Sequence, residues 1–282
     1  MDIGIVGLGL IGGSLAKAIK KNTPHRVFGL DVDVESLKKA FLTGAVDGEL
    51  KDLGSLDMLI VALYPAATVR YVTENADKID KKCIVMDVSG VKGAVCGPLF
   101  PLAREKGFTF IGGHPMAGVE FSGFDHAREA LFKNASMVLV PDKNVTIDKL
   151  VAVKELFTAL GFARMQVSTA EEHDKMIALT SQLAHVLSSA YVKSPSAVSH
   201  KGFSAGSFRD MTRVAKLNED MWCELFFDNR ENLLGEIDGL IARLSEYRAA
   251  LYERDGDEMK RLLKEGREKK ALAEKNYEKT QS

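Results

Sequence analysis

One histidine in the chain stands in a segment whose composition points to chemistry. Residues 112–118 read GGHPMAG, which places His114 between a Gly pair and Pro115. The glycines allow a close approach of the backbone to a ligand, and the proline restricts His114 to an extended conformation. A histidine held in this way can take the proton of an alcohol while hydride leaves the same carbon. The spacing alone fits a structural histidine, hydrogen-bonded within a loop, equally well.

A glycine-rich turn near the N-terminus suggests the hydride acceptor. Residues 3–16 read IGIVGLGLIGGSLA, in which a G-x-G-x-x-G pattern lies between an apolar strand-like run and a helix-like run. Gly7 permits the tight turn, Gly9 lets the backbone approach a pyrophosphate, and Gly12 lets the helix pack close to the strand. The start of the helix offers unpaired N–H groups to phosphate. We expect the dinucleotide to contact the turn and the end of a later strand, through Gly7, Leu8, Gly9, Leu10, Ile11, Gly12, Tyr64 and Pro65.

An acidic residue closes the second predicted strand, VFGLD, nineteen residues after Gly12. A carboxylate at Asp31 can accept both ribose hydroxyls of NAD and repels a 2′-phosphate, so NAD is favoured over NADP. The alternative is that Asp31 caps the following helix. Asp33 is better placed for that role, because it stands directly before the helical run VESLKKAF.

These residues need a sheet that brings them to one edge. Strand-like and helix-like runs alternate in the first part of the chain, with strands expected at 3–6, 27–30, 58–63, 84–88, 108–111 and 137–140. Strands that are apolar on both faces are typical of a parallel sheet covered by helices. We therefore predict an α/β fold: a Rossmann-type doubly wound domain at residues 1–167, followed by an all-α domain at 168–282. His114 then lies at the carboxyl edge, where such sheets bind ligands.

The helical part is expected to contain a long helix at 171–191, further helix over 211–251 and an amphipathic helix at 257–279. The loop-like stretch is 193–207. We interpret the last helix mainly as a solvated surface, and otherwise as part of a dimer interface. Apolar faces that one domain would leave exposed to water make a homodimer the expected assembly.

Composition excludes several classes of protein. The chain has 282 residues, 46% hydrophobic and 27% charged, with 38 basic and 39 acidic side chains and a net charge of −1. That balance argues against nucleic acid or an acidic membrane surface as the main partner. No apolar run reaches the ~18–20 residues of a membrane span. Cys83, Cys96 and Cys223 show no metal spacing, so we expect no metal site and reduced thiols in a cytoplasmic protein.

Four segments together resemble the prephenate/arogenate dehydrogenases of tyrosine biosynthesis. They are GLGLIGGSLA, DVSGVKG (87–93), GGHPMAGVEFSG (112–123) and FRDMTRVAKLNEDMWCELFFDN (208–229). The resemblance runs over nearly the whole chain in the same order. It implies an oxidative decarboxylation in which NAD takes hydride from the ring carbon bearing the hydroxyl, the ring carboxylate leaves as carbon dioxide, and the ring becomes aromatic.

The resemblance also implies roles for individual residues. His114 accepts the hydroxyl proton, and Arg213 binds a substrate carboxylate, a task suited to a planar guanidinium. The segment TSQLAHVLSSA (180–190) lines the substrate pocket, with His185 as a second active-site histidine; Ser181, Gln182 and Trp222 complete it, and Glu120 is a candidate to meet an ammonium group. On the residues alone, Arg213 fits a surface ion pair, His185 a hydrogen-bonded residue in a helix bundle, and Trp222 a core residue.

Two positions depart from the family pattern. Many relatives have Ser directly before Val-Lys of DVSGVKG, where it helps to position the catalytic histidine and the cofactor; here that residue is Gly90, and Ser89 precedes it. Ser89 is the candidate to serve this role, through a shifted loop; the sequence leaves open whether it compensates for Gly90. Gln182 stands where some relatives have His, and we expect this position to bear on the choice between prephenate and arogenate, which differ by a keto group against an ammonium group.

Prephenate dehydrogenase activity is the main expectation, in a form without a chorismate mutase segment or a separate regulatory domain. Arogenate dehydrogenase is the first alternative. A 3-hydroxyacid dehydrogenase would need a catalytic Lys; Lys175 is the nearest candidate, but Leu179 stands where that class has Asn. A non-catalytic NAD-binding sensor is the last alternative, and the shifted serine is its only support.

Overall fold

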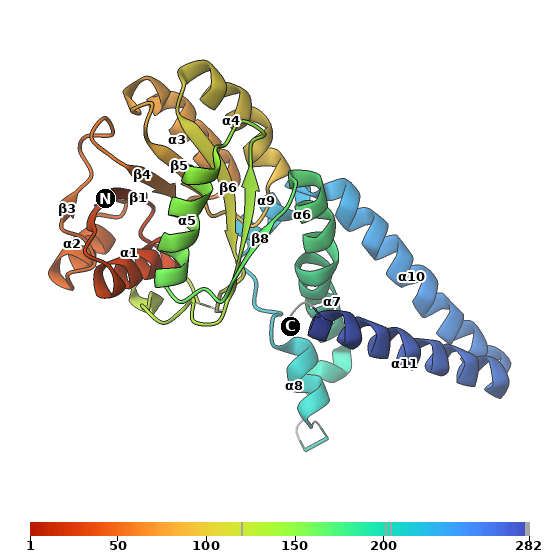
Figure 1. Cartoon of the computed structure of the whole chain (residues 1–282). Coiled ribbons are helices and arrows are strands. Elements are labelled where there is room, and N and C mark those ends of the chain that lie inside the picture. Colours follow the sequence, from red (N-terminus) through yellow and green to blue (C-terminus); the bar gives the residue numbers. More distant parts are fainter. Residues whose placement is uncertain (120, 201, 204, 280–282) are drawn as a thin grey trace. The chain divides into compact units, whose positions relative to one another are not determined.

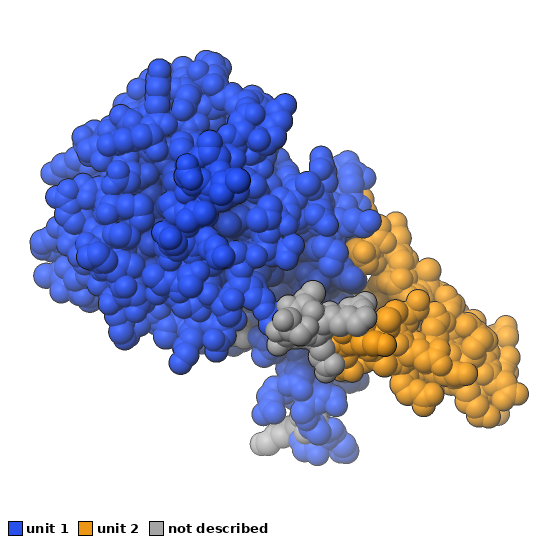
Figure 2. Space-filling model, in the orientation of Figure 1, with its two compact units in different colours: residues 1–233 blue, residues 234–282 orange. Residues whose placement is uncertain are grey.

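The computed structural model describes residues 1–119, 121–200, 202–203 and 205–279. By its internal contacts the chain forms two compact units, residues 1–233 and residues 234–282, which are coloured separately in Figure 2. Each unit is described by itself below.

The first unit contains one eight-stranded sheet with the order β3-β2-β1-β4-β5-β6-β7-β8. Its strands are β1 (Asp2–Val6), β2 (Arg26–Leu30), β3 (Gly48–Glu49), β4 (Met58–Val61), β5 (Ile84–Asp87), β6 (Thr109–Pro115), β7 (Ser136–Pro141) and β8 (Arg164–Val167). The strand order reverses at β1, which pairs in parallel with both β2 and β4. This topology confirms the predicted Rossmann-type fold.

The sheet departs from the all-parallel arrangement expected from the sequence. β6 and β7 pair antiparallel, with His114 opposite Val138. Parallel neighbours need a crossover, usually a helix, whereas the connection from β6 to β7 holds only the short 3-10 turn Phe124–His126 among its described residues. β3 and β8 were also missed, because β3 has two residues and β8 carries partly or fully exposed side chains instead of an apolar run.

Helices cover both faces of the sheet (Figure 1). They are α1 (Leu10–Asn22), α2 (Val34–Leu42), α3 (Pro65–Asn75, continued by a 3-10 turn at Ala76–Lys78), α4 (Gly93–Lys106) and α5 (Ile147–Ala159). One buried apolar cluster contains Leu15 of α1 and Phe157 of α5, and the other contains Val72 of α3 and Leu99 of α4. Burial on both faces explains why the central strands are apolar throughout.

A helical segment follows β8 within the same unit. It begins with α6 (Ala170–Ile177), passes through a π-helical turn at Ala178–Leu183 and continues as α7 (Ala184–Val192), which together match the helix predicted at 171–191. The 3-10 turn Pro195–Val198, α8 (Gly206–Thr212) and α9 (Glu219–Asp228) come next, and α10 (Arg230–Glu253) begins in this unit and continues in the second. π-helical turns inside helices often mark functional sites.

The second unit is a pair of helices. The chain leaves α10 through a turn at Arg254, whose φ is 56°, and enters α11 (Gly256–Lys279), the helix predicted at 257–279. Inside the unit Ala250 and Leu262 are buried, and the Tyr247 hydroxyl donates to the Leu262 carbonyl. Apolar side chains exposed on this unit include Ile241, Leu244, Leu251, Leu263 and Leu272. Over the described part of the chain, every helix is too short or too polar to span a bilayer.

Candidate active site

The glycine turn lies at the point where the strand order reverses. Gly7 has φ +87°, and a Cβ there would lie 2.5 Å from the Ala62 carbonyl oxygen. A Cβ on Gly12 would lie 1.8 Å from the Gly7 carbonyl oxygen. By contrast, no protein atom lies within 4 Å of a Cβ built on Gly9. Two glycines are therefore required by the fold, and the third leaves an open approach to the backbone, as a pyrophosphate needs.

Asp31 fastens this turn to the second strand. Its carboxylate accepts from the backbone N–H of Leu8 at 2.6 Å and from that of Asp33 at 2.8 Å. Asp33, in turn, caps α2 by accepting from the N–H groups of Glu35 and Ser36. The alternative role of Asp31 as the helix cap is therefore wrong. Its carboxylate lies beside the glycine turn, at the position from which a ribose would be recognised.

The other residues expected to contact the dinucleotide are at the same edge. Leu8 belongs to the turn itself, and Leu10 and Ile11 begin α1. Tyr64 and Pro65 follow β4 and begin α3, with Tyr64 as the N-cap and 46% exposed. Because β1 and β4 are parallel neighbours, their carboxyl ends meet, and these residues could hold a dinucleotide there.

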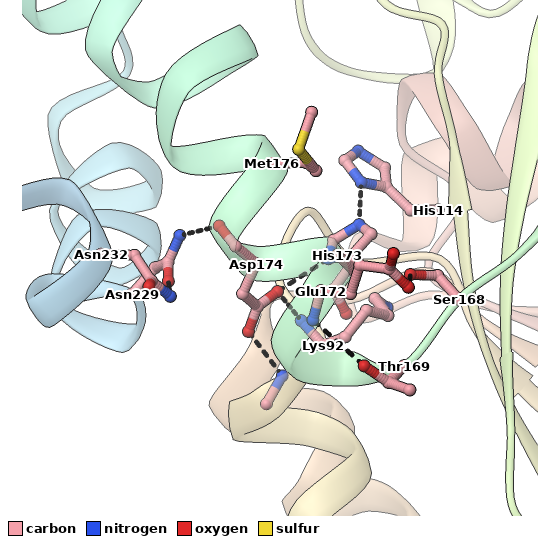
Figure 3. Close-up of polar contacts among 12 residues, drawn as sticks. Lys92, His114, Ser168, Thr169, Glu172, His173, Asp174, Met176, Asn229 and Asn232 are labelled. Carbon is pink, nitrogen blue, oxygen red and sulfur yellow. Dashed lines mark hydrogen bonds and ion pairs between the residues drawn. The ribbon is translucent and has the colours of Figure 1, made fainter. Parts of the chain in front are cut away.

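His114 occupies the end of β6 and contacts a second histidine. Its Nδ1 lies 2.9 Å from Nε2 of His173, and Nδ1 of His173 lies 2.7 Å from Oδ1 of Asp174 (Figure 3). Asp174 also accepts from the backbone N–H of Lys92 at 2.8 Å and from that of Gly93 at 2.7 Å. Gly93 is the first residue of α4, so the carboxylate satisfies N–H groups at the start of that helix. A continuous chain of polar contacts thus joins β6, α6 and α4.

The pKa of His114 is lowered well below its ordinary value. The main cause is burial, which disfavours the charged imidazolium, and the neighbouring His173 and Lys92 act in the same direction. His114 is therefore neutral at pH 7 and able to accept a proton.

A buried ion pair supports the strand just before His114. The Lys92 ammonium, fully buried, contacts the Asp87 carboxylate and donates to the Gly113 carbonyl at 2.7 Å. Asp87 also accepts from the Ser89 hydroxyl at 2.7 Å and from the Ser89 N–H at 2.9 Å. Ser89 is thus tied to Asp87. Its expected action on His114 and on the cofactor stays a prediction.

The structure also brings His185, Trp222 and Arg213 together. Nδ1 of His185 donates to the Ser181 carbonyl at 2.8 Å, and its ring lies 4.0 Å from that of Trp222 between centroids. The pKa of His185 is lowered mainly by burial; the Ser181 carbonyl opposes this, and the charge of Arg213 adds to it. Arg213 follows directly after α8, and Trp222 lies on α9. Glu120, the remaining candidate for this pocket, lies outside the described residues.

Gln182 lies in the π-helical turn and is 1% exposed. Its amide donates to the Leu225 carbonyl at 2.7 Å and accepts from Asn229 at 2.8 Å. Asn229 also donates to the backbone carbonyl of Asp174 at 2.8 Å. These contacts tie the π-helical turn and α6 to α9 and the residue after it. A role for Gln182 towards substrate stays a prediction.

Four residues of this site were missed by sequence reasoning: Asp87, Lys92, His173 and Asp174. The available signals were weak. Asp87 and Lys92 stand inside the DVSGVKG segment, and His173 and Asp174 are adjacent titratable residues near the start of a predicted helix. Nothing in the local sequence indicates that the segment with Lys92 contacts the helix with Asp174.

Comparison with known families decides the class of protein. A family model described as the nucleotide-binding domain of prephenate dehydrogenase matches residues 15–166. A second, described as the dimerization domain of prephenate dehydrogenase, matches residues 169–265. The chain belongs to the prephenate dehydrogenase family.

Two curated proteins that are similar to this chain are named as dehydrogenases of this kind. A prephenate dehydrogenase of Bacillus subtilis is 30% identical over 92% of this chain and 72% of its own length. A cyclohexadienyl dehydrogenase of Zymomonas mobilis is 30% identical over 93% of this chain and 92% of its own length.

Solved structures agree over nearly the whole chain. Prephenate dehydrogenase from Aquifex aeolicus, in complex with hydroxyphenyl propionate and NAD⁺, has a TM-score of 0.84 at 26% identity and covers 97% of this chain and 98% of its own. Arogenate dehydrogenase of Synechocystis has a TM-score of 0.81 at 26% identity, covering 97% and 100%. A 3-hydroxyisobutyrate dehydrogenase from Salmonella typhimurium, at 15% identity and a TM-score of 0.59, shares the fold alone.

The glycine turn gives a matched pair of substitutions. We expect Gly12→Ala to destabilise the protein by about 1–3 kcal/mol, because its Cβ would collide with the Gly7 carbonyl. Gly9→Ala meets no protein atom, so its stability should stay within about 0.5 kcal/mol of the wild type. Its affinity for NAD, the cofactor expected from the sequence, should fall about tenfold or more, a loss of about 1.4 kcal/mol. Urea unfolding and NAD titration measure the two effects. Unchanged NAD affinity in Gly9→Ala would remove this turn from the cofactor site.

Proposed function

We propose that this enzyme catalyses the NAD-dependent oxidative decarboxylation of prephenate to 4-hydroxyphenylpyruvate. The observation that carries the proposal is the state of His114: a neutral, partly buried histidine at the carboxyl edge of a Rossmann-type sheet, with Nδ1 already engaged by His173. Nε2 is the ring nitrogen left for a substrate hydroxyl.

The residues at the switch point fit a dinucleotide. The open side of Gly9 would let a pyrophosphate approach the backbone, where the N-terminus of α1 would offer it N–H groups that have no partner within the helix. Asp31 accepts two backbone N–H groups, and a carboxylate has further lone pairs with which to accept from ribose hydroxyls. Its charge opposes a 2′-phosphate, which favours NAD over NADP. NAD supplies the acceptor for the hydride that leaves the substrate.

His114 supplies the base. In the proposed reaction the hydroxyl proton moves to Nε2 of His114 while the C–H bond of the same carbon gives up hydride. The bond from the ring to its carboxylate breaks, carbon dioxide leaves, and the electron pair of that bond completes the aromatic ring. Proton acceptance by a positioned side chain contributes typically about 10²–10⁴-fold to rate.

The substrate's other end is assigned to the helical residues. Arg213 would hold a carboxylate through charge-assisted hydrogen bonds. His185 and Trp222, whose rings are in contact, would form a wall of the pocket beside it, with Ser181 and Gln182 on the π-helical turn. Arogenate is the second candidate substrate, because one similar structure is an arogenate dehydrogenase and one curated relative a cyclohexadienyl dehydrogenase. A homodimer is the proposed assembly, supported by the match to a dimerization domain.

The first test is a direct assay. Purified protein is mixed with NAD and with prephenate or arogenate in parallel, and NADH formation is followed by its absorbance. We expect turnover with prephenate, and a larger kcat/KM for prephenate than for arogenate. The reverse ratio would make the enzyme an arogenate dehydrogenase. NAD binding without turnover of either substrate would favour the non-catalytic sensor.

Burial of His114 predicts the pH dependence. A base whose pKa lies well below 6.5 stays neutral, and so active, as the pH falls from 8 towards 6. We therefore expect kcat/KM to be flat from pH 8 down past the ordinary histidine pKa of about 6.5, with any loss of activity centred well below that value. Initial rates taken before the acid-labile substrate decays measure this. A fall in kcat/KM centred above pH 6.5 would contradict the assignment of His114 as the neutral base.

Replacing His114, the proposed base, should lower the turnover rate. We expect His114→Asn to lower kcat about 10²–10⁴-fold with little change in KM, because the group acts mainly in the transition state. His25→Asn is the control: His25 lies at the opposite end of the strands, beside the N-terminal amine, and its loss should leave both constants unchanged. A raised KM with unchanged kcat in His114→Asn would assign the residue to binding alone.

A further inference from the structure

We propose that His173 and Asp174 are positioning residues that set the tautomer of His114, so that Nε2 presents a lone pair to the substrate. The proposal rests on the proposed function, in which His114 is the base. Neither residue is assigned contact with substrate or cofactor. Both act through His114.

The direction of the hydrogen bonds is fixed at Asp174. Its Oδ1 accepts from the N–H of Lys92 and its Oδ2 from the N–H of Gly93, and backbone N–H groups can only donate. The carboxylate oxygens therefore act as acceptors. Nδ1 of His173, 2.7 Å from Oδ1, must then carry the proton of that hydrogen bond.

The polarity passes through two imidazoles. A neutral imidazole has one donor and one acceptor nitrogen. The proposal takes His173 as neutral in the resting enzyme: with its proton on Nδ1 it offers a lone pair at Nε2, which lies 2.9 Å from Nδ1 of His114. His114 must then carry its own proton on Nδ1 and keep a lone pair on Nε2. The opposite tautomer would place a proton on Nε2 and leave no base towards the substrate hydroxyl.

Each member of the chain is held independently of the others. The backbone carbonyl of Asp174 accepts from Asn229, and its carboxylate is fixed at the start of α4, while the His173 side chain is 1% exposed (Figure 3). The strand carrying His114 is fixed by its pairing with β7 and by the bond from Lys92 to Gly113. The rings of His114 and His173 meet edge to face, with centroids 5.1 Å apart and planes at 60°. Little freedom remains except the tautomer, which this chain sets.

The proton balance of the reaction is consistent with this arrangement. When Nε2 of His114 takes the hydroxyl proton, the resulting imidazolium carries protons on both nitrogens, and Nδ1 still donates to the lone pair of His173. The electron pair of the broken bond to the carboxylate leaves a negative charge on the ring oxygen, and this oxygen takes the proton back from Nε2 before the phenol product is released. The tautomer of the resting enzyme is restored without movement of His173 or Asp174.

The first measurement is the tautomer of His114 in the wild-type protein. In protein labelled with ¹⁵N in histidine, long-range ¹H–¹⁵N correlations distinguish a protonated ring nitrogen from one with a lone pair. The His114 signals are assigned by their loss in His114→Asn. We expect protonated Nδ1 and unprotonated Nε2. A protonated Nε2 in the resting enzyme would overturn the proposal, and this result does not depend on finding the right substrate.

Kinetics of His173 variants give the second measurement. His173→Phe keeps a ring but removes both nitrogens, so we expect kcat to fall about 10- to 100-fold, a typical loss for a partner that orients an active residue, with KM within about twofold. In the same variant the His114 signals should show protonation at Nε2. His173→Gln can offer its amide oxygen near the position of Nε2, and should recover most of the lost kcat.

Glu172→Gln is the matched control on the same helix, because Glu172 is exposed, its carboxylate accepts from Ser168, and its backbone N–H, which the substitution keeps, donates to the N-cap Thr169; it should behave as wild type. Wild-type kcat in His173→Phe, or equal losses in the Phe and Gln variants, would reduce His173 to a packing residue and overturn the proposal. If His173→Phe does not fold, the wild-type tautomer and the Gln variant still decide. A wild type that binds NAD but turns over neither substrate would refute the proposed function. The NMR measurement would still determine the tautomer of His114.

Discussion

The carboxylate of Asp174 at the start of α4 is the contact on which the rest of the site depends. It accepts two N–H groups from a helix of the Rossmann-type sheet and one from a histidine on α6, so a single side chain joins the two parts of the site. Hydrogen bonds to a charged acceptor are stronger than those between neutral groups, and a helix N-terminus favours negative charge. This contact fixes α6 at the start of α4 and thereby holds His173 against the end of β6.

The same edge of the sheet explains why distant segments act together. Parallel strands end at one edge, so the glycine turn after β1, Tyr64 after β4 and Ser89 after β5 gather there although they are far apart in sequence. β6 runs in the same direction as β5 and brings His114 to this edge as well. β7 then returns antiparallel beside it, so His114 is backed by a paired strand instead of an open edge.

Local chemistry was predictable from the sequence, and long-range pairing was not. Gly7 and Gly12 are dictated by a turn within a few residues, and Asp33 by the helix that it caps, so their roles could be deduced from neighbouring residues. His114 could be singled out by its Gly and Pro neighbours. Its partner His173 is 59 residues away and the Lys92–Asp174 contact spans 82 residues. No periodicity encodes such contacts, and the antiparallel return of β7 escaped for the same reason. β8 escaped because its side chains are partly or fully exposed and form no apolar run.

The position of His173 between Asp174 and His114 also satisfies two opposing requirements on a catalytic base. A carboxylate in direct contact with His114 would orient the ring, but its negative charge would raise the pKa of His114 and favour the imidazolium at neutral pH. Burial and the positive charge of Lys92 act the other way and keep His114 neutral. With His173 between them, Asp174 passes on the direction of the hydrogen bonds while its charge stays one ring farther away. His114 can then be both firmly oriented and unprotonated at Nε2, the two properties that abstraction of a hydroxyl proton requires.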